Sequence, residues 1–245
     1  MATQIYDLGM AAADFIDEKS VRPIAIALSF PEDQIRLFLF WFAYFPLGWF
    51  FHYCVRGEKA RHGLNVTLGI LGMFYFFGVT TLHVVIMSSV SWLIMRYMPR
   101  DKQQNYVCAF VFLYLSCSHI NTLIFHWNSY DLEITTNTML LTLRLQAMAF
   151  SYYDGGQPVD KLTARQQRMK IDQLPTLMEM ASYTFYLPQC ALGVFFEYRD
   201  FKCWAEETEE YKNVPSPILE SLKYMVYALL CTGVFVIGNT YFPLT

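Results

Sequence analysis

Apolar residues along the chain gather into blocks that polar segments separate, and most of the blocks are long enough to cross a membrane. A transmembrane helix needs about 20 mainly apolar residues. The pattern predicts spans at residues 35–54, 64–78, 79–98, 105–125, 137–153 and 217–245. Together with a shorter apolar block at 181–196, these predict an all-α, polytopic transmembrane protein with about six to seven membrane segments.

Two of the apolar blocks are shorter than an ordinary span. The block at 64–78 lies at or below the usual minimum length, so its end near Gly78 is the least sharply defined boundary in the pattern. The block at 181–196 contains Pro188, which interrupts regular helical hydrogen bonding. We therefore expect a re-entrant or kinked element there, buried in protein rather than exposed to lipid.

The polar segment 154–180 separates the last two long blocks and is predicted to be a soluble segment with a short helix. Thr163 and Gln166 have the spacing of a capping box, in which each side chain bonds the other's backbone amide. Because proline disfavours helical geometry in the residue before it, this helix should end before Pro175.

The first 28 residues are predicted to form an interfacial or amphipathic helix. They lack the basic start and the uninterrupted apolar core of a secretory signal. Four apolar residues instead share one helical face: Leu8, Ala11, Ala12 and Phe15. The predicted organisation is thus a helix at 1–28, which lies at the interface or packs on the core, followed by a multi-span domain at 29–245.

Lysine and arginine are concentrated in three of the polar segments, which predicts the orientation of the chain. A basic loop at 55–63, a second at 96–104 and the segment 154–180 carry these residues, whereas the loop at 126–136 has none. Positively charged loops face the cytosol, so the N-terminus and the loop at 126–136 should face the lumen or exterior. The glycosylation pattern NVT at Asn65 then falls on the cytosolic side, and we do not expect it to be used.

Composition supports a membrane protein and excludes several other classes. Of the 245 residues, 55% are hydrophobic and only 16% charged, whereas an average soluble domain has about 25% charged residues. The net charge of -3 argues against a nucleic-acid partner. The six cysteines form no C-x-x-C pair and lie mostly in apolar blocks, so they predict packing residues rather than a metal site. No motif of a serine hydrolase, P-loop enzyme or zinc protease is present.

Polar side chains inside the apolar blocks are the candidate functional residues, and Arg144 is the most demanding of them. An arginine at the centre of a membrane costs roughly 2.5 to 3.5 kcal/mol on insertion scales. Arg144 must therefore face protein, a water-filled cavity or an anionic ligand. Two interpretations stay open, namely a place on a substrate path and a structural contact with a partner such as a carboxylate.

His83 and Glu179 are the other two candidates for a substrate path. His83 lies a few residues inside its predicted span, where a histidine bonded to a backbone carbonyl is the alternative. Glu179 lies where the polar segment returns to the membrane, and a contact within its helix or at the cytosolic face is the alternative. None of these residues suggests a metal site.

The stretch LIFHWNSYD at 123–131 contains a histidine and an asparagine, His126 and Asn128. These residue types serve as general base and oxyanion partner in many enzymes. The stretch is nevertheless predicted to lie on the lumenal side, so we interpret it as a polar turn between spans. Trp127 and Tyr130 would anchor this turn at the membrane interface.

Six stretches in register resemble the lysophospholipid acyltransferases of the membrane-bound O-acyltransferase family. They are LSFPEDQIRLFLF, FGVTTLHVVIMSSVSWLIM with His83, NYVCAFVFLYL, LLTLRLQAMAFSYYDG with Arg144, LTARQQRMKIDQLPTLMEMASYTF with Pro175, Leu177 and Glu179, and LGVFFEYRDF. In the last stretch Gly193 is followed by Val194, where the family has proline. The resemblance covers nearly the whole chain from residue 29.

The resemblance implies acyl transfer from acyl-CoA to the free hydroxyl of a lysophospholipid, as in phospholipid remodelling at the endoplasmic reticulum membrane. A histidine acts as general base, without metal or cofactor. Acyl-CoA enters from the cytosol and the lysolipid enters from the bilayer. Arg144 would suit the anionic groups of either substrate.

The family's catalytic histidine and asparagine lie in a second half with a W-H-G-like motif, which this sequence lacks. The chain thus resembles the N-terminal half of a larger acyltransferase helical core, a fragment or short isoform that is inactive alone, with its catalytic residues beyond Thr245. The alternatives are a non-catalytic membrane scaffold or regulatory partner of a full-length enzyme, and a transporter fragment. The transporter would require internal repeats, which are not seen. FFEYRDF resembles the inositol branch, whereas LSFPEDQI and TARQQ resemble the serine and ethanolamine branch.

Overall fold

The computed structural model describes residues 16–28, 30–125, 134–189, 195–208, 211–212 and 214–241. Within these ranges the regular secondary structure is entirely helical, which confirms the all-α prediction. The α-helices are α2 (Arg22–Leu28), α3 (Glu32–Cys54), α4 (Glu58–Phe77), α5 (Leu82–Tyr97), α6 (Gln103–Phe125), α7 (Ile134–Asp154), α8 (Ala164–Met169), α9 (Leu177–Thr184), α10 (Tyr198–Glu206) and α11 (Ile218–Tyr241). Short 3₁₀ turns lie at Gly78–Thr81, Val159–Lys161 and Leu187–Gln189.

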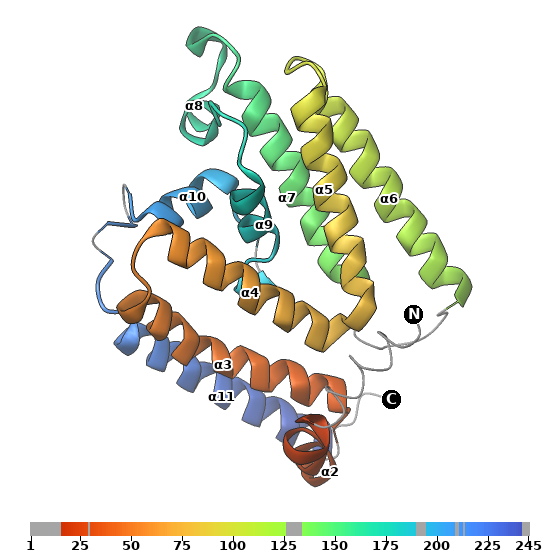
Figure 1. Cartoon of the computed structure of the whole chain (residues 1–245). Helices are drawn as coiled ribbons and strands as arrows, with labels where there is room; N and C mark the ends of the chain where they lie inside the picture. Colours follow the sequence, from red (N-terminus) through yellow and green to blue (C-terminus); the bar gives the residue numbers. More distant parts are fainter. Residues whose placement is uncertain are drawn as a thin grey trace.

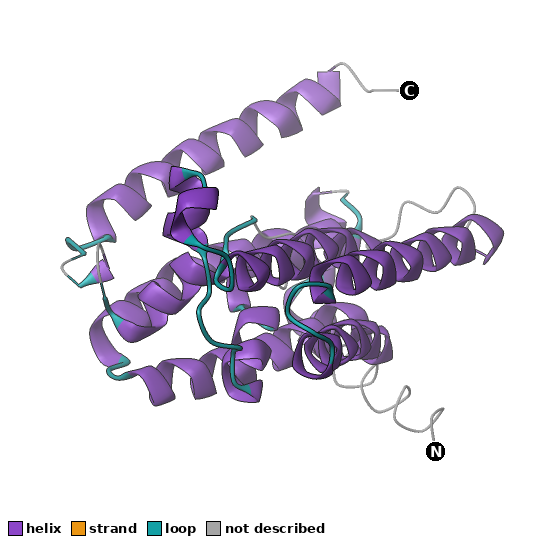
Figure 2. Ribbon diagram, turned by 90° about the horizontal axis from the view of Figure 1, so that it is seen from above, coloured by secondary structure: helices purple, strands orange, loops and turns teal. Residues whose placement is uncertain are grey.

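The long helices form two groups that the short helices connect (Figure 1). Helices α5, α6 and α7 pack side by side, whereas α3 and α4 run at an angle to them, with α11 along α3. The short helices α8, α9 and α10 gather at one end of the molecule, where α9 contacts α4 and α5 and α10 contacts α4 and α7. In the view from above, α11 extends away from the other long helices over part of its length (Figure 2).

Among the residues that the structure describes, four helical stretches are long and apolar enough to cross a membrane, namely Glu32–Cys54, Glu58–Tyr97, Gln103–Phe125 and Ile218–Gly238. They confirm a polytopic helical membrane protein. The stretch Glu58–Tyr97 contains both α4 and α5. A 3₁₀ turn separates these helices at Gly78, whose φ of +53° favours glycine, so the predicted break near this residue is confirmed.

The predicted basic loop at 55–63 is wrong, because α4 already begins at Glu58. Only three residues connect α3 to α4, ending at Gly57, which adopts a φ of +84°. Arg61 and His62 are buried in the first turns of α4, where the helix packs against α10. Local sequence could not show this, because the residues that bury Arg61 lie more than a hundred positions further along the chain.

Two of the three basic segments that were predicted to share one side of the membrane, 96–104 and 154–180, lie in contact. Arg100, between α5 and α6, donates hydrogen bonds to the carbonyl oxygens of Tyr152, at 2.8 Å, and Ile171, at 2.7 Å. Gly155 permits this approach, since a Cβ atom there would lie 2.0 Å from the Ile171 oxygen. The grouping agrees with the charge pattern, and the assignment of these segments to the cytosol stays a prediction.

The predicted capping box of Thr163 and Gln166 is confirmed, and α8 ends at Met169, before Pro175. A second capping box, formed by Thr176 and Glu179, begins α9. The apolar block at 181–196 contains the second half of α9 and the 3₁₀ turn Leu187–Gln189, which are short helical pieces whose apolar side chains are largely buried in protein. Residues 190–194 of this block, including Gly193 and Val194, lie outside the described residues.

The described part of the N-terminal segment packs onto the long helices. The buried carboxylate of Asp17 forms an ion pair with Arg36 of α3 and accepts a hydrogen bond of 2.7 Å from the Tyr75 hydroxyl of α4. A small apolar cluster adjoins it, formed by Val21, Ala25 and Ile35. Residues 1–15, with the four apolar residues predicted to share a face, lie outside the described residues. The boundary between residues 28 and 29 stays a prediction.

Candidate functional site

One face of α4 holds the short segment that forms the floor of the candidate site. The Asn65 side-chain amide donates a hydrogen bond of 2.7 Å to the Ser182 carbonyl oxygen, and its oxygen accepts one of 3.1 Å from the Leu187 amide. One turn further along, Gly69 lies directly against Phe185, and a Cβ atom at residue 69 would lie 1.8 Å from the Phe185 carbonyl oxygen. Asn65 is 1% exposed and its amide is engaged, so it is no acceptor for glycosylation in the folded chain.

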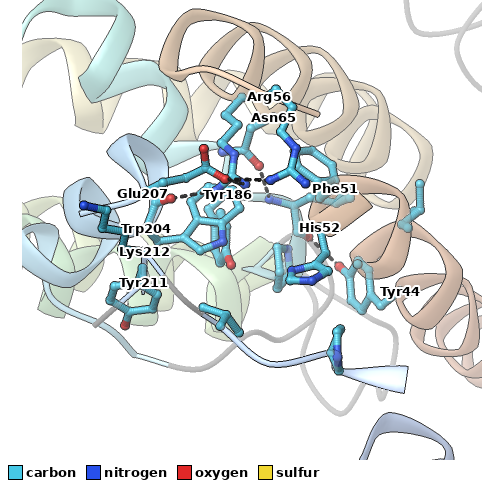
Figure 3. Close-up of a pocket in the computed structure, with 17 residues that line it drawn as sticks. Tyr44, Phe51, His52, Arg56, Asn65, Tyr186, Trp204, Glu207, Tyr211 and Lys212 are labelled. Carbon is cyan, nitrogen blue, oxygen red and sulfur yellow. Dashed lines mark hydrogen bonds and ion pairs between the residues drawn. The ribbon is translucent and has the colours of Figure 1, made fainter. Parts of the chain in front are cut away.

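A cavity of about 530 Å³ lies beside this face (Figure 3). Its walls come from the end of α3, the start of α4, the 3₁₀ turn Leu187–Gln189, α10 and the stretch that leads to α11. The lining combines basic side chains with aromatic rings. The basic residues are Arg56, Arg61, Lys212 and His52, and the aromatic residues are Tyr44, Phe51, Tyr186, Trp204 and Tyr211.

Arg61 is a fixed part of the cavity wall. Its guanidinium donates a hydrogen bond of 2.8 Å to the Trp204 carbonyl oxygen and lies 5.5 Å from the centre of the Trp204 ring. It also pairs with the Glu207 carboxylate at 2.5 Å, which Arg56 approaches at 3.5 Å. Two guanidinium groups thus share one carboxylate, and Lys212 adds a third positive charge to the lining. The charged lining therefore favours an anionic group.

The aromatic wall gives the same cavity an apolar surface. Tyr186 contacts Trp204 edge to face, with ring centres 5.3 Å apart, and the Tyr44 hydroxyl donates a hydrogen bond of 2.5 Å to the Leu187 carbonyl oxygen. Burial raises the pKa of Tyr186 to about 12, so its hydroxyl stays neutral at physiological pH. A cavity lined by both basic groups and aromatic rings suits an amphiphile with an anionic part.

Arg144 lies in the protein core and does not line this cavity. Its side chain is 0% exposed, and its guanidinium lies over the ring of Tyr183 at 4.0 Å and that of Phe196 at 4.4 Å. It also donates a hydrogen bond to the Tyr183 carbonyl oxygen. Of the surroundings considered for Arg144, the structure shows protein, and two aromatic rings with a carbonyl oxygen take the place of the expected carboxylate.

His83 lies apart from the cavity, on the exposed surface of α5. Its Nδ1 atom is 2.7 Å from the hydroxyl oxygen of Tyr114 on α6, and the two rings meet edge to face. The partner of His83 among the described residues is thus a side-chain hydroxyl, where a backbone carbonyl had been the alternative. A place for His83 on a substrate path stays a prediction.

Glu179 lies in the first turn of α9 and makes a contact within its own helix, which was the alternative to a place on a substrate path. The Thr176 amide donates a hydrogen bond of 2.7 Å to its carboxylate, and the Lys202 ammonium lies 3.3 Å from it. Burial alone would raise the pKa of Glu179, but the hydrogen bonds from Thr176 and the charge of Lys202 together hold it below its ordinary value. Glu179 thus belongs to α9, and Arg144 contacts α9 through Tyr183. His83 lies elsewhere, on α5.

The cavity residues were missed by sequence reasoning, although part of the signal was present. Arg61, Asn65 and Gly69 recur every four residues, so they share one face of α4 inside an apolar stretch. Such a line of polar and small residues indicates a close helix contact. Nothing local pointed to Trp204 and Glu207. The stretch with His126 and Asn128 lies outside the described residues from residue 126 onward.

Comparison with known proteins gives a consistent family assignment. The model of the membrane-bound O-acyltransferase family matches residues 120–242. Membrane-bound glycerophospholipid O-acyltransferase 2 of Mus musculus is 27% identical over 215 residues, which cover 84% of this chain and 41% of that protein. Lysophospholipid acyltransferase 6 of Drosophila melanogaster is 25% identical, over 73% of this chain and 27% of that protein. Lysophospholipid acyltransferase 5 of Mus musculus is 26% identical, over 92% of this chain and 46% of that protein.

The chain thus spans less than half the length of these curated relatives. The family match begins near the end of α6 and extends to the end of α11, so it includes Arg144, the segment from Thr176 to Leu187 and the α10 wall of the cavity. It covers half of the 245 residues. The chain belongs to the membrane-bound O-acyltransferase family.

Proposed function

We propose that the chain is part of an enzyme that transfers an acyl group from acyl-CoA to the hydroxyl of a lysophospholipid. The observation that carries this proposal is the family membership, combined with relatives named as lysophospholipid or glycerophospholipid acyltransferases that align with 73% to 92% of the chain. The hydroxyl oxygen attacks the thioester carbonyl, an ester forms, and the thiol of CoA leaves. The hydroxyl proton passes to a general base, which returns it to the departing sulfur of CoA.

The described residues support a binding and positioning role within that reaction. The histidine and asparagine implied by the resemblance match no motif in this sequence, so we place the proton transfer outside residues 1–245. The cavity with Arg56, Arg61 and Lys212 has the charge to hold the phosphate-bearing part of acyl-CoA, and its rings can contact the apolar part. It lies beside the basic segment 55–63, on the side of the membrane that we propose to be cytosolic. The membrane would be that of the endoplasmic reticulum.

Within this proposal Arg144 and Glu179 act as positioning residues. Both fix α9, which leads into the 3₁₀ turn at the cavity floor. A change at either residue would reach the substrate through the position of Tyr186 and Leu187, rather than through direct contact. His83 stays a candidate for the lipid side of the path, because it lies on an exposed helix surface within a candidate span.

The test is incorporation of labelled oleoyl-CoA into a panel of lysophospholipids with choline, ethanolamine, serine, inositol and glycerol head groups. Membranes should contain either residues 1–245 or any longer product of the same gene, in cells that lack other acyltransferases of this class. We expect transfer by the longer product to a subset of head groups and none by residues 1–245 alone. Failure of the longer product on every lysolipid would overturn the proposed reaction, and transfer by residues 1–245 would overturn the placement of the proton transfer.

A further inference from the structure

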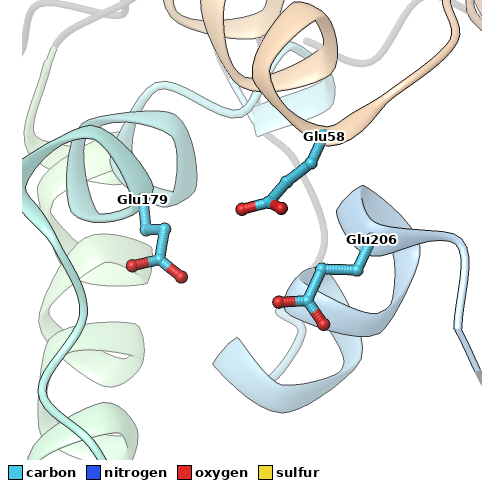
Figure 4. Close-up of side chains that lie close together, drawn as sticks. All are labelled: Glu58, Glu179 and Glu206. Atoms are coloured by element: carbon cyan, nitrogen blue, oxygen red, sulfur yellow. The ribbon is translucent and has the colours of Figure 1, made fainter.

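Three glutamates from separate segments converge at the end of the molecule where the short helices gather (Figure 4). Glu58 lies in the first turn of α4, Glu179 in the first turn of α9 and Glu206 at the end of α10. Their carboxylate oxygens lie within 4.8 Å of one another. Like charges at this separation repel, so the arrangement requires a compensating positive charge.

The Lys202 ammonium compensates only part of this charge. It lies 3.3 Å from the Glu179 carboxylate and 3.5 Å from that of Glu206. With all three carboxylates ionised, one ammonium leaves a formal charge of -2 on the cluster. A divalent cation that takes the place of the ammonium would lower the charge of the cluster to -1. Because the Lys202 side chain is 40% exposed, its ammonium can leave the cluster for water when a cation enters.

A buried histidine beside the cluster is the second, independent observation. His62 is only 4% exposed, and neither of its ring nitrogens has a hydrogen-bond partner among the described residues. Its Nε2 atom faces the cluster and lies 3.9 Å from the Glu58 carboxylate, too far for a hydrogen bond. A buried polar group without a partner is unfavourable unless something binds it. Imidazole nitrogen is also the commonest metal ligand among side chains.

We propose that Glu58, Glu179, Glu206 and His62 bind a divalent first-row metal ion of the Mn²⁺ type. Carboxylates alone suit Mg²⁺ and Ca²⁺, whereas the added imidazole favours a first-row transition ion. The ion reaches the cluster from a cavity of about 460 Å³ that has Lys202 and Glu206 in its wall. This cavity is distinct from the one lined by Arg61, with which it shares no lining residue.

The role of the ion is to fasten α4, α9 and α10 together at this end of the molecule. Each of these helices contributes a carboxylate, and α4 contributes the imidazole as well. The contacts among α4, α9 and α10 also shape the first cavity, but the metal takes no part in acyl transfer. The inference is therefore independent of the proposed function and can be tested without an activity assay.

The probe is Mn²⁺, titrated into the full chain in detergent after treatment with a chelator. Loss of the free-ion signal in electron paramagnetic resonance measures binding, and thermal unfolding followed by size-exclusion chromatography measures its effect on stability. We expect a single saturable site and a melting temperature that rises with Mn²⁺ concentration. Absence of saturable binding at millimolar Mn²⁺ would overturn the proposal.

Variants decide whether the ion sits in this cluster. Glu58→Gln and Glu206→Gln should each weaken Mn²⁺ binding by about tenfold or more. Glu220→Gln is the matched control, because Glu220 is also an exposed glutamate in the first turn of a helix. We expect no change in that variant. Equal binding by all three variants and the unchanged chain would show an adventitious ion only.

Lys202→Met separates a metal site from a self-contained ion-pair cluster. In both cases removal of the ammonium leaves three unneutralised carboxylates, so the variant should melt at a lower temperature than the unchanged chain without metal. At a metal site the variant binds Mn²⁺ more tightly, because no ammonium competes, and Mn²⁺ restores its melting temperature. If Mn²⁺ fails to restore it, the carboxylates are held by Lys202 alone and the proposal is wrong.

Discussion

Replacement of Gly69 by alanine tests the closest contact in the scaffold of the site. The Cβ atom introduced by Gly69→Ala would lie 1.8 Å from the carbonyl oxygen and 2.8 Å from the carbonyl carbon of Phe185, whereas real Cβ contacts below 3.0 Å are essentially never seen. Both obstructing atoms belong to the backbone, so no side chain can rotate out of the way. The segment after α9 must therefore move away from α4 by more than an ångström.

The size of the effect follows from what that movement breaks. Overpacking a core typically costs about 1–3 kcal/mol. The Asn65 hydrogen bonds to Ser182 and Leu187 flank the contact, and losing them would add about 1 kcal/mol each. We expect a loss of about 3–5 kcal/mol, which corresponds to a fall in melting temperature of roughly 6–20 °C for a chain of this size.

A matched control lies in the same helix. At Gly63 the introduced Cβ would meet only the flexible end of Met178, at 3.8 Å. Because alanine is favoured over glycine inside a helix by about 0.5–1 kcal/mol, Gly63→Ala should leave the melting temperature equal or slightly higher. Both variants are compared as the full chain in detergent, by loss of the monodisperse chromatographic peak on heating. Equal melting temperatures for the two variants would show that Phe185 does not lie against residue 69.

Three further predictions concern charged residues. The pKa of Glu179 is lower in the folded chain than its ordinary value of 4.5. The ionised carboxylate therefore stabilises the chain at neutral pH, and this stabilisation is lost as the pH falls below 4.5. The melting temperature of Glu179→Gln should consequently depend less on pH in that range. Arg144→Lys should lower the melting temperature by several degrees, because an ammonium cannot lie flat over two rings and bond a carbonyl as well. Arg61→Gln should lower the free energy of unfolding by about 2 kcal/mol or more, because buried hydrogen bonds are lost. Arg56→Gln changes a side chain that is 69% exposed, so it should leave the melting temperature unchanged and raise the KM for acyl-CoA in a longer active product.

Sequence reasoning located the long helices because their apolar blocks are a local property. The starts of α6 and α11, the break at Gly78 and the capping box at Thr163 all depend on neighbouring residues, and each was predicted to within a few positions. The start of α4 was misplaced because its first turns are charged, which in isolation is typical of a loop. Burial of Arg61 depends on Trp204 and Glu207, which no local pattern connects to it.

The candidate residues show the same division between local and distant information. Arg144 could be identified as costly from its position in an apolar block. The nature of its surroundings could not, because Tyr183 and Phe196 reach it from the far end of a polar segment. The Glu58, Glu179 and Glu206 cluster was equally hidden, since three segments must come together before the carboxylates meet.

Helix α9 has eight residues, which is too short for a helix to be stable on its own. Long helices hold it and its flanks through side chains from three directions. Asn65 on α4 bonds Ser182 and Leu187, and Arg144 on α7 bonds Tyr183. From α5, Trp92 donates to the Pro175 carbonyl at 2.9 Å, and Ser88 bonds Thr184 at 3.1 Å.

The cavity floor is the continuation of this held segment, since Tyr186 and Leu187 follow α9 directly. Asn65 and Arg144 are polar residues that are unfavourable in apolar helices, and both hold α9 in place, which is too short to be stable alone. It follows that the shape of the cavity depends on residues such as Arg144 that do not line it. Substitutions at Asn65 and Arg144 should consequently be non-additive, because both act on the position of the same eight-residue helix.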